Sequence, residues 1–387
     1  MKPIVPLLVV MVLGVACDPA ATLAQRSAAG QSTRDIRTED GMIRVEVITR
    51  GLDHPWGLAF LPDERMLVTE RPGRLRVITR DGRASAPVQN VPAVYAHGQG
   101  GLLDVALDPD FAANRLVYLS YAEPGPNDTA STAVARGQLN QAATALDNVT
   151  VIFRQEPKVP GGNHFGSRLV FAPDGMLFIS TGERFKFEPA QDLSNDLGKI
   201  VRIKRDGTIP PDNPFVGKPG VRPEIWSYGH RNVQGAAIDP RTGLLWAHEF
   251  GPRGGDELNI PQAGHNYGWP LVSAGRHYDG RPIPDPSTRP DFVAAVYQWT
   301  PVISPSGMVF YTGNLFPGWR GDILIGGLSA QGIVRVTLDG NKVRGEHRIK
   351  LGQRIRDVAQ GPDGAVYALT DQTDGEVLRL SPAHGKD

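Results

Sequence analysis

The chain has 387 residues, with 41 basic and 41 acidic side chains, 45 glycines, 33 prolines and one cysteine. The balanced charge argues against a nucleic-acid-binding protein, which usually carries an excess of basic residues. A single cysteine excludes a disulfide framework and a cysteine-based zinc site. Apolar residues make up 40% of the chain, enough for a core, while the high glycine and proline content favours many turns over a helical bundle.

Residues 1–24 are typical of an export signal, because Lys2 precedes an apolar run that is short for a membrane-spanning helix. Two processing routes stay open. Cleavage after Ala24 would release a soluble protein, whereas cleavage before Cys17 would create a lipoprotein acylated at that residue. Both routes predict export to the periplasm or the cell exterior, and an anchor at Cys17 would be the one link to a membrane. Residues 25–40 are small and polar, which predicts a flexible tether.

A degenerate repeat organises the rest of the chain. A short apolar run, a turn rich in Pro, Asp or Gly, and a second apolar run recur six times, within residues 58–69, 105–120, 169–180, 237–247, 308–325 and 358–370. Runs of this length with such turns are typical of β-hairpins. At about 55 residues a copy, each unit suits one propeller blade with its loops. We therefore predict an all-β fold, a single six-bladed β-propeller of four-stranded antiparallel blades over residues 41–387. A pair of β-sandwiches is the alternative.

The longest intervals between turns fall in the middle of the chain, and loops on a rigid scaffold usually carry function. His164 lies there in the glycine-rich segment 161–168, and Glu183 follows the next predicted strand. If the strands around residues 169–180 pair as a hairpin, the two side chains lie at the same end of it. A carboxylate that holds an imidazole is the arrangement of a general base. An ordinary loop histidine is the alternative.

Arg231 and Asn232 stand together before another predicted strand, in the segment 225–235. A cation next to an amide can bind an anionic ligand. The alternative is a loop that closes a blade and holds a structural ion pair.

The segment 249–259 combines carboxylates with glycines, including Glu257. Carboxylate and backbone oxygens in such a loop suit Ca²⁺, and Tyr267 could add a carbonyl. The pattern is not that of an EF-hand, and an acidic loop that caps strands is the alternative.

Arg354 and Arg356 point the same way if their segment is extended. Two guanidiniums on one face, with Asp357 as the nearby carboxylate, are costly unless an anion neutralises them; a solvated outer face is the alternative. Trp299 is either a stacking wall or part of the core. Together, these segments predict a site for a polyanionic and planar ligand, with a base and a calcium ion.

The chain resembles the soluble aldose sugar dehydrogenases that use pyrroloquinoline quinone (PQQ), relatives of soluble quinoprotein glucose dehydrogenase. The resemblance runs from about Gly51 to Leu380. Its most specific segments occur in the family's order and are residues 97–103, 163–164, 228–232, 251–257 and 354–357. The family is a six-bladed propeller, in agreement with the repeat count. The resemblance implies oxidation of an aldose at C1 to the lactone by hydride transfer to PQQ. It also implies an external electron acceptor, such as a quinone, dye or cytochrome, and a monomer or homodimer.

The resemblance also implies residue roles. His164 matches the base that takes the proton from the sugar C1 hydroxyl, and Glu183 matches the carboxylate that orients it. The residues matched to the groups that hold PQQ are Gln99, Arg231, Asn232, Tyr278, Ser329, Ala330, Gln331, Arg354, Ile355 and Arg356. The residues matched to calcium ligands are Gly251 and Pro252, whose carbonyls would face the Ca²⁺ on PQQ, and Glu257 and Tyr267.

One segment departs from the family. Glucose-oxidising relatives use a lysine in the fifth-blade loop to contact PQQ, and residues 327–332 of this chain contain no lysine. The cofactor would then contact this segment through backbone, Ser329 or Gln331. Two other functions stay open: a calcium-dependent propeller hydrolase such as a lactonase, which would need no arginine cluster, and a non-catalytic binding propeller.

Overall fold

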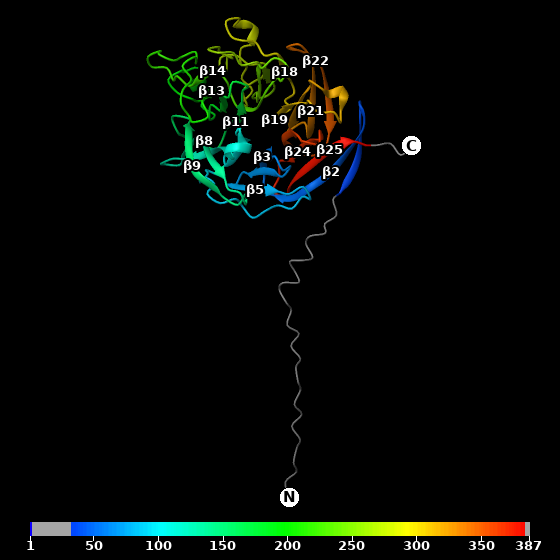
Figure 1. Cartoon of the computed structure of the whole chain (residues 1–387). Coiled ribbons are helices and arrows are strands. Elements are labelled where there is room, and N and C mark those ends of the chain that lie inside the picture. The colour runs from blue at the N-terminus through cyan, green and yellow to red at the C-terminus, as the bar shows by residue number, and fades with distance from the viewer. Residues whose placement is uncertain (2–31, 384–387) are drawn as a thin grey trace. The chain divides into compact units, whose positions relative to one another are not determined.

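The structure, a computed structural model, describes Met1 and residues 32–383. Within the compact unit Thr33–Asp387, the described residues form six antiparallel sheets. The innermost strand of each sheet contacts the innermost strand of the next sheet, and the innermost strand of the sixth sheet contacts that of the first sheet. The sheets therefore close into a ring of blades (Figure 1). The predicted six-bladed β-propeller is confirmed. The predicted export signal and Cys17 lie outside the described residues.

The blades follow one another along the chain, and blades 1 to 5 each begin with their innermost strand. Blade 1 contains β3 (Pro55–Phe60), β4 (Met66–Glu70) and β5 (Arg74–Ile78). Blade 2 contains β6 (Leu102–Leu107), β7 (Leu116–Pro124), β8 (Thr129–Leu139), β9 (Leu146–Arg154) and β10 (Val159–Pro160). Blade 3 contains β11 (Gly166–Phe171), β12 (Leu177–Thr181), β13 (Lys199–Ile203) and β14 (Ile225–Tyr228). Blade 4 contains β15 (Val233–Ile238), β16 (Leu245–Glu249), β17 (Asp256–Asn259) and β18 (Tyr297–Trp299). Blade 5 contains β19 (Pro305–Phe310), β20 (Ile323–Gly327), β21 (Gly332–Asp339) and β22 (Lys342–Lys350). Blade 6 contains β23 (Ile355–Gln360), β24 (Val366–Thr370), β25 (Gly375–Pro382), β2 (Gly41–Leu52) and β1 (Thr33–Thr38).

Helices are short in this fold: α2 spans Phe111–Asn114, and 3-10 turns span Glu188–Ala190, Pro286–Thr288 and Pro317–Trp319. In the described part of the chain, no helix has the length and apolar character needed to cross a membrane. Blades 3, 4 and 5 have the expected four strands, whereas blade 1 has three and blades 2 and 6 have five. Beside β5 of blade 1, the Ser85 backbone N–H donates to the Val77 carbonyl at 2.8 Å, so this extended segment takes the fourth position.

Blade 6 joins the two ends of the propeller. β2 pairs antiparallel with β25, and β1 pairs with β2 at the outer edge of the sheet (Figure 1). The prediction of a tether over residues 25–40 is wrong for Thr33–Thr38, which are strand β1, so the propeller begins before residue 41. Two contacts hold this strand in place. Ile36 packs against the core, and Asp40 forms an ion pair with Arg335 at 2.9 Å.

Apolar clusters fill the space between neighbouring blades. Among the described residues, the six largest clusters each combine side chains from two adjacent sheets, one cluster for each blade interface. Trp299 is 3% exposed and belongs to the cluster between blades 4 and 5, so it is part of the core. Because burial of apolar surface stabilises each interface, the ring is a rigid scaffold for the loops at its ends.

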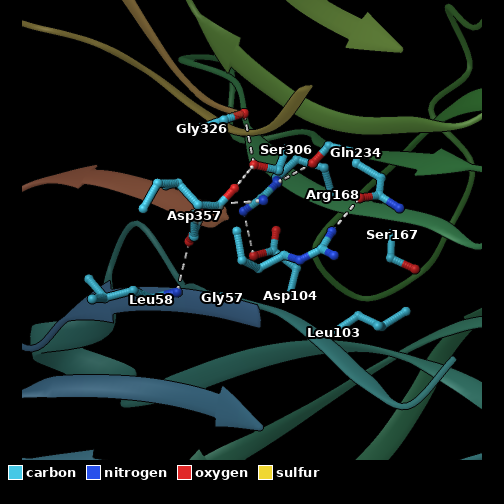
Figure 2. Close-up of polar contacts among 12 residues, drawn as sticks. Gly57, Leu58, Leu103, Asp104, Ser167, Arg168, Gln234, Ser306, Gly326 and Asp357 are labelled. Atoms are coloured by element: carbon cyan, nitrogen blue, oxygen red, sulfur yellow. Dashed lines mark hydrogen bonds and ion pairs between the residues drawn. The ribbon is translucent and has the colours of Figure 1, made fainter. Parts of the chain in front are cut away.

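A polar network occupies the centre of the ring. Each innermost strand has a β-bulge near its start, where its pairing with the second strand shifts register. Arg168 Nη1 lies 2.8 Å from Asp104 Oδ1, and Arg168 Nη2 lies 3.1 Å from Asp357 Oδ1 (Figure 2). The backbone N–H of Leu58 donates to Asp357 Oδ2 at 3.0 Å. This buried network therefore ties together the inner strands of blades 1, 2, 3 and 6.

Candidate active site

His164 and Glu183 meet at one end of the β11–β12 hairpin, as the sequence predicts. The hairpin pairs Gly166 with Thr181, so the residues just beyond these two face each other. His164 Nδ1 lies 2.7 Å from Glu183 Oε1, and both side chains are buried. An ionised carboxylate accepts hydrogen bonds and donates none, so Nδ1 carries the proton and Nε2 keeps its lone pair. His164 Nε2 makes no hydrogen bond to any residue that the structure describes.

Backbone contacts hold both members of this pair. Glu183 Oε2 accepts the backbone N–H of Phe187 at 3.0 Å and that of Lys186. Gln99 Oε1 accepts the backbone N–H of His164 at 2.9 Å. His164 has a φ of 53°, a left-handed conformation that side chains other than glycine and asparagine rarely adopt. The imidazole is therefore held in one orientation before any ligand binds.

The surroundings of the pair keep the imidazole neutral. Burial lowers the pKa of His164 below its ordinary value, and the positive charge of Arg231 lowers it further, while the hydrogen bond that His164 donates to Glu183 opposes both. Burial is the largest influence on Glu183 and acts to raise its pKa, but the interaction with His164, the backbone N–H of Phe187 and the charge of Arg231 together outweigh burial and leave that pKa lowered. A neutral imidazole next to an ionised carboxylate is the protonation state of a general base.

A cleft opens beside the histidine. The ring of Phe185 packs edge-on against the His164 ring, with 5.2 Å between centroids, and borders a cavity of about 210 Å³. The cavity is lined by Phe185, Phe187, Arg231, Pro252, His277, Tyr278, Asp279 and Arg281. An adjoining cavity of about 430 Å³ shares three of these side chains and adds Glu188 and Gln191. Aromatic walls with a few polar groups suit a small polar ligand such as a sugar.

A further cavity, which we call the arginine pocket, has a volume of about 380 Å³. It is lined by His54, Trp56, Arg71, Gln99, Gln234, Phe250, Ser304, Leu328, Arg354, Arg356 and Asp371. Gln99 connects the pocket to the base, because its side chain also accepts the His164 N–H. Arg354 and Arg356 both reach the pocket, as the sequence predicts.

The carboxylate that pairs with Arg354 and Arg356 belongs to Asp371 and not to Asp357. Asp371 Oδ2 lies 3.1 Å from Nη2 of both Arg354 and Arg356. Burial opposes ionisation of Asp371, but the two guanidiniums lower its pKa to about 2. The expectation that Asp357 lies beside the arginines is wrong, because the bulge at Arg356 turns Asp357 toward Arg168 at the ring centre. One carboxylate shared by two guanidiniums leaves the pocket positively charged, which suits an anion.

Arg231 lines the cleft, and Asn232 follows it just before β15. Arg231 Nη1 donates to the Gly251 carbonyl at 3.1 Å, and Nη2 donates to the Tyr278 hydroxyl at 3.1 Å. Within residues 32–383 no carboxylate pairs with the Arg231 guanidinium, although its backbone N–H donates to Glu249 Oε2, and its buried Nε has no hydrogen bond. The pair within the segment 225–235 is instead that of His230, whose Nδ1 lies 2.9 Å from Glu249 Oε1. Asn232 Oδ1 accepts the backbone N–H of Gly166 at 3.0 Å, which fixes the start of β11.

A cavity of about 10 Å³, the size of a single ion or water, lies beside Arg231. The predicted calcium residues Gly251, Glu257 and Tyr267 line it together with Glu249, whereas Pro252 borders the cleft. Burial and the charge of Glu249 raise the pKa of Glu257 to about 8.

Asn259 does not line this cavity but contacts both of its carboxylates. Asn259 Oδ1 is buried without a partner, and its amide nitrogen lies 3.3 Å from both Glu249 Oε1 and Glu257 Oε2. No three carboxylate, imidazole or thiol side chains gather as a metal cluster in the described part of the chain. A cation here would therefore take part of its ligands from amide and backbone carbonyl oxygens, which is usual for Ca²⁺.

Of the ten predicted cofactor residues, Gln99, Arg354 and Arg356 line the arginine pocket, and Arg231 and Tyr278 line the cleft. The other five line neither, and these are Asn232, Ser329, Ala330, Gln331 and Ile355. Ser329, Ala330 and Gln331 form the turn between β20 and β21, and the preceding residue, Leu328, borders the pocket instead. The Ile355 side chain is fully buried in the apolar cluster between blades 5 and 6. It alternates with its arginine neighbours across the strand, so it faces the core.

Sequence reasoning missed Trp56, Arg71, Gln234 and Asp371, all of which line the arginine pocket. A repeated signal could have found Asp371. A carboxylate lies within two residues of the end of the second strand in blades 1, 2, 3, 4 and 6, and these residues are Glu70, Glu123, Glu183, Glu249 and Asp371. Trp56 lies in the bulge of β3, and no motif in the sequence marks it.

Comparison with known proteins agrees with this geometry. The family model of glucose/sorbosone dehydrogenases matches residues 52–379. The chain is 49% identical over 347 residues to the aldose sugar dehydrogenase YliI of Escherichia coli, and the match covers 88% of this chain and 93% of that protein. Among solved structures, the apo form of the soluble aldose sugar dehydrogenase of E. coli has a TM-score of 0.84 at 48% identity, covering 88% of this chain and all of that one (100%). The PQQ-bound aldose sugar dehydrogenase of Streptomyces coelicolor has a TM-score of 0.73 at 31% identity, covering 91% and 98%. The chain belongs to the glucose/sorbosone dehydrogenase family.

Proposed function

We propose that the chain oxidises aldose sugars at C1 to the lactone, with PQQ as the hydride acceptor, Ca²⁺ as a second cofactor and an external electron acceptor. The observation that carries this proposal is the neutral His164, held by Glu183, beside a cleft and next to the arginine pocket. A base beside a sugar-sized cleft supplies the proton transfer, and a positively charged pocket suits a polyanionic cofactor.

The arginine pocket fits the cofactor in charge and in unsatisfied donors. PQQ is planar and carries three carboxylates. Arg354 and Arg356 share one aspartate, and the Nε groups of Arg71 and Arg356 are buried without a partner. Orphaned buried donors are costly until an acceptor reaches them. Arg354, Arg356 and Gln99 would hold the carboxylates and quinone oxygens, and Trp56 offers an aromatic face to the ring system.

Arg231, Asn232 and Tyr278 would hold the cofactor where the arginine pocket approaches the cleft, because Arg231 joins the tyrosine to the Gly251 carbonyl. Ser329, Ala330 and Gln331 do not border the pocket, and Ile355 faces the core, so we assign these four residues no side-chain contact with PQQ.

The small cavity lined by Glu249 and Glu257 fits Ca²⁺, since it gathers two carboxylates, and Asn259, which contacts both of them, has an unpartnered Oδ1. Gly251 and Tyr267 would add carbonyl oxygens. We propose that Pro252, whose ring borders the cleft, presents its carbonyl to the cofactor calcium.

The residues of the chain would divide the chemistry as follows. When bound, PQQ supplies a quinone that accepts the hydride of sugar C1. His164 Nε2 accepts the proton of the C1 hydroxyl, and Glu183 stabilises the imidazolium that forms. Arg231, which lines the cleft, would offer a positive charge to the quinone of the bound cofactor. The aromatic walls at Phe185 and Phe187 exclude water from one side of the sugar.

Reconstitution tests the proposal. Purified protein freed of cofactor is mixed with PQQ and Ca²⁺, and dye reduction is followed with a panel of aldoses. We expect turnover that requires both additions. Absence of turnover with every aldose, together with no change in quinone absorbance, would reject the proposal. Hydrolysis of a lactone by the protein with Ca²⁺ alone would support the hydrolase reading, which the arginine pocket disfavours because a hydrolase has no use for it.

A further inference from the structure

The arginine pocket receives no lysine from blade 5. Residues 327–332 contain no lysine, and the blade-5 residue of this loop that borders the pocket is the apolar Leu328. Ser329 and Gln331 are exposed outside the pocket. The cationic guanidiniums among the described lining residues are those of Arg71, Arg354 and Arg356, so blade 6 and blade 1 supply the positive charge.

Arg71 follows β4 and is fixed from several sides. Its backbone N–H donates to the His54 carbonyl at 3.1 Å, and its carbonyl accepts the Leu102 N–H at 3.0 Å. Its side-chain Nη1 donates to the Gly98 carbonyl at 2.9 Å, in the loop that carries Gln99. The guanidinium is therefore held at the wall of the pocket without help from a carboxylate.

Arg71 is short of both charge and hydrogen-bond partners. No carboxylate of the described residues lies within ion-pair distance of it, and its Nε is buried without an acceptor. The preceding carboxylate, Glu70, turns the other way and pairs with Arg74 and Arg76. Burying donors and a cation without partners costs free energy, which a ligand that supplies an anion would recover.

The charge of Arg71 acts inside the pocket. Burial lowers the pKa of Arg356, Asp371 opposes that effect, and the nearby charges of Arg71 and Arg354 lower the pKa further. Three guanidiniums thus face one lining carboxylate, Asp371, among the described residues. The excess of positive charge in the arginine pocket is therefore larger than Arg354 and Arg356 of blade 6 alone would create.

We propose that Arg71 binds a carboxylate of the polyanionic cofactor from blade 1 and supplies the cation that the fifth-blade loop lacks. The inference rests on the proposed function, since it names a further binding residue of the same site. A guanidinium can bind a carboxylate with two hydrogen bonds, which a lysine cannot do. Arg71 also holds the Gly98 carbonyl, so it would link cofactor binding to the loop whose Gln99 fixes His164.

Titration of cofactor-free protein with PQQ, at fixed Ca²⁺ and several salt concentrations, tests this assignment. We expect Arg71→Gln to weaken binding about 10- to 100-fold and to reduce the dependence of the affinity on salt, because one charge-assisted contact is lost. The matched control is Arg80→Gln, an exposed arginine of the same blade that pairs with Glu64, and its affinity should equal that of the wild type. Equal PQQ affinities for Arg71→Gln and wild type at every salt concentration would overturn the assignment.

A second measurement uses the wild-type protein and so does not depend on a variant that folds. Phenylglyoxal modifies accessible arginines, and mass spectrometry reports the extent at each site. Saturating PQQ should protect Arg71 and leave Arg80 unprotected. Equal modification of Arg71 with and without PQQ would contradict the proposal. A wild-type protein that binds no PQQ in the titration would instead reject the proposed function, so the two failures are distinguishable.

Discussion

The protonation of His164 follows from two opposing influences at the same ring. Burial and Arg231 favour the neutral imidazole, whereas the Glu183 hydrogen bond favours the charged one, and the balance leaves the pKa of His164 below its ordinary value. For a base that must be neutral to act, a lowered pKa widens the pH range in which it is active.

We therefore expect kcat/KM of the reconstituted enzyme to rise with pH along a limb that lies below pH 6.5, the ordinary pKa of histidine, and to level off near neutrality. A pH–rate profile with one aldose checks this. His164→Ala should bind PQQ normally and lose about 10²–10⁴-fold in rate at every pH. A variant that binds PQQ and keeps the full rate would show that His164 is not the base.

Glu183→Gln separates the two roles of the carboxylate. Because Glu183 raises the pKa of His164, its loss should move the acid limb to still lower pH. The rate should nevertheless fall about 10²–10⁴-fold, because an amide neither stabilises the imidazolium nor enforces the Nδ1–H tautomer. Glu64→Gln, at an exposed carboxylate of blade 1, serves as control. A limb displaced to higher pH would contradict this account of the pair.

At the scale of strands, the bulges of the inner strands bring charged side chains to the centre of the ring. There, the pKa of each carboxyl depends on the charges of its neighbours. Arg168 there pairs with Asp104 and Asp357, and its guanidinium lies over the Trp56 ring at 4.7 Å. Burial, with the charge of Asp357, raises the pKa of Asp104 to about 6 in spite of Arg168. A carboxyl with a raised folded-state pKa binds its proton more tightly when folded, so its contribution to stability falls as pH rises from about 4 to about 6.

Arg168→Met should destabilise the fold by about 3–5 kcal/mol at pH 8, because it leaves two buried carboxylates without a cation. At pH 5 the loss should be smaller, since the carboxyls can then be protonated. Urea unfolding of wild type and variant at both pH values measures the difference. Adding Asp104→Asn to the variant should recover part of the stability at pH 8. A loss of equal size at pH 5 and pH 8 would show that the charges are not its cause.

The strand scale also explains which parts of the site could be predicted. His164 and Glu183 were paired from sequence because a hairpin places the residues beyond its two ends together, whatever its exact register. The partner of Arg354 and Arg356 was misassigned, because the bulge that turns Asp357 to the axis and the register that brings Asp371 across from β24 leave no mark in a single sequence. Strand β1 was missed because its small and polar residues resemble a tether, and its stability comes from β2 and from Arg335.

At the scale of the whole propeller, the ring closes through β2. This strand pairs with β25 and contributes Leu52 to the apolar cluster between blades 6 and 1, and Ile43 and Val45 to the cluster between blades 5 and 6. Strand β1, by contrast, covers an edge and contributes partly buried Ile36.

Deletion of residues 33–52 should therefore prevent folding, since it exposes β25 and removes part of two blade interfaces. Deletion of residues 33–40 should leave a folded propeller with a lower Tm, because it removes an edge strand and the Asp40–Arg335 ion pair. Size-exclusion chromatography and thermal unfolding compare the two proteins. A folded protein after the longer deletion would show that the remaining strands close the ring without β2.

The position of β2 also sets the order in which the molecule can be completed during synthesis. Arg354, Arg356 and Asp371 belong to blade 6, the last blade to be made, and the outer strand of that blade comes from the beginning of the propeller. A nascent or truncated chain that lacks either end of the propeller therefore has an incomplete blade 6, and Arg354 and Arg356 are not held in place. Under the proposed function, capture of PQQ would then mark a completed chain, and a cofactor titration would count the molecules in which β2 has paired with β25.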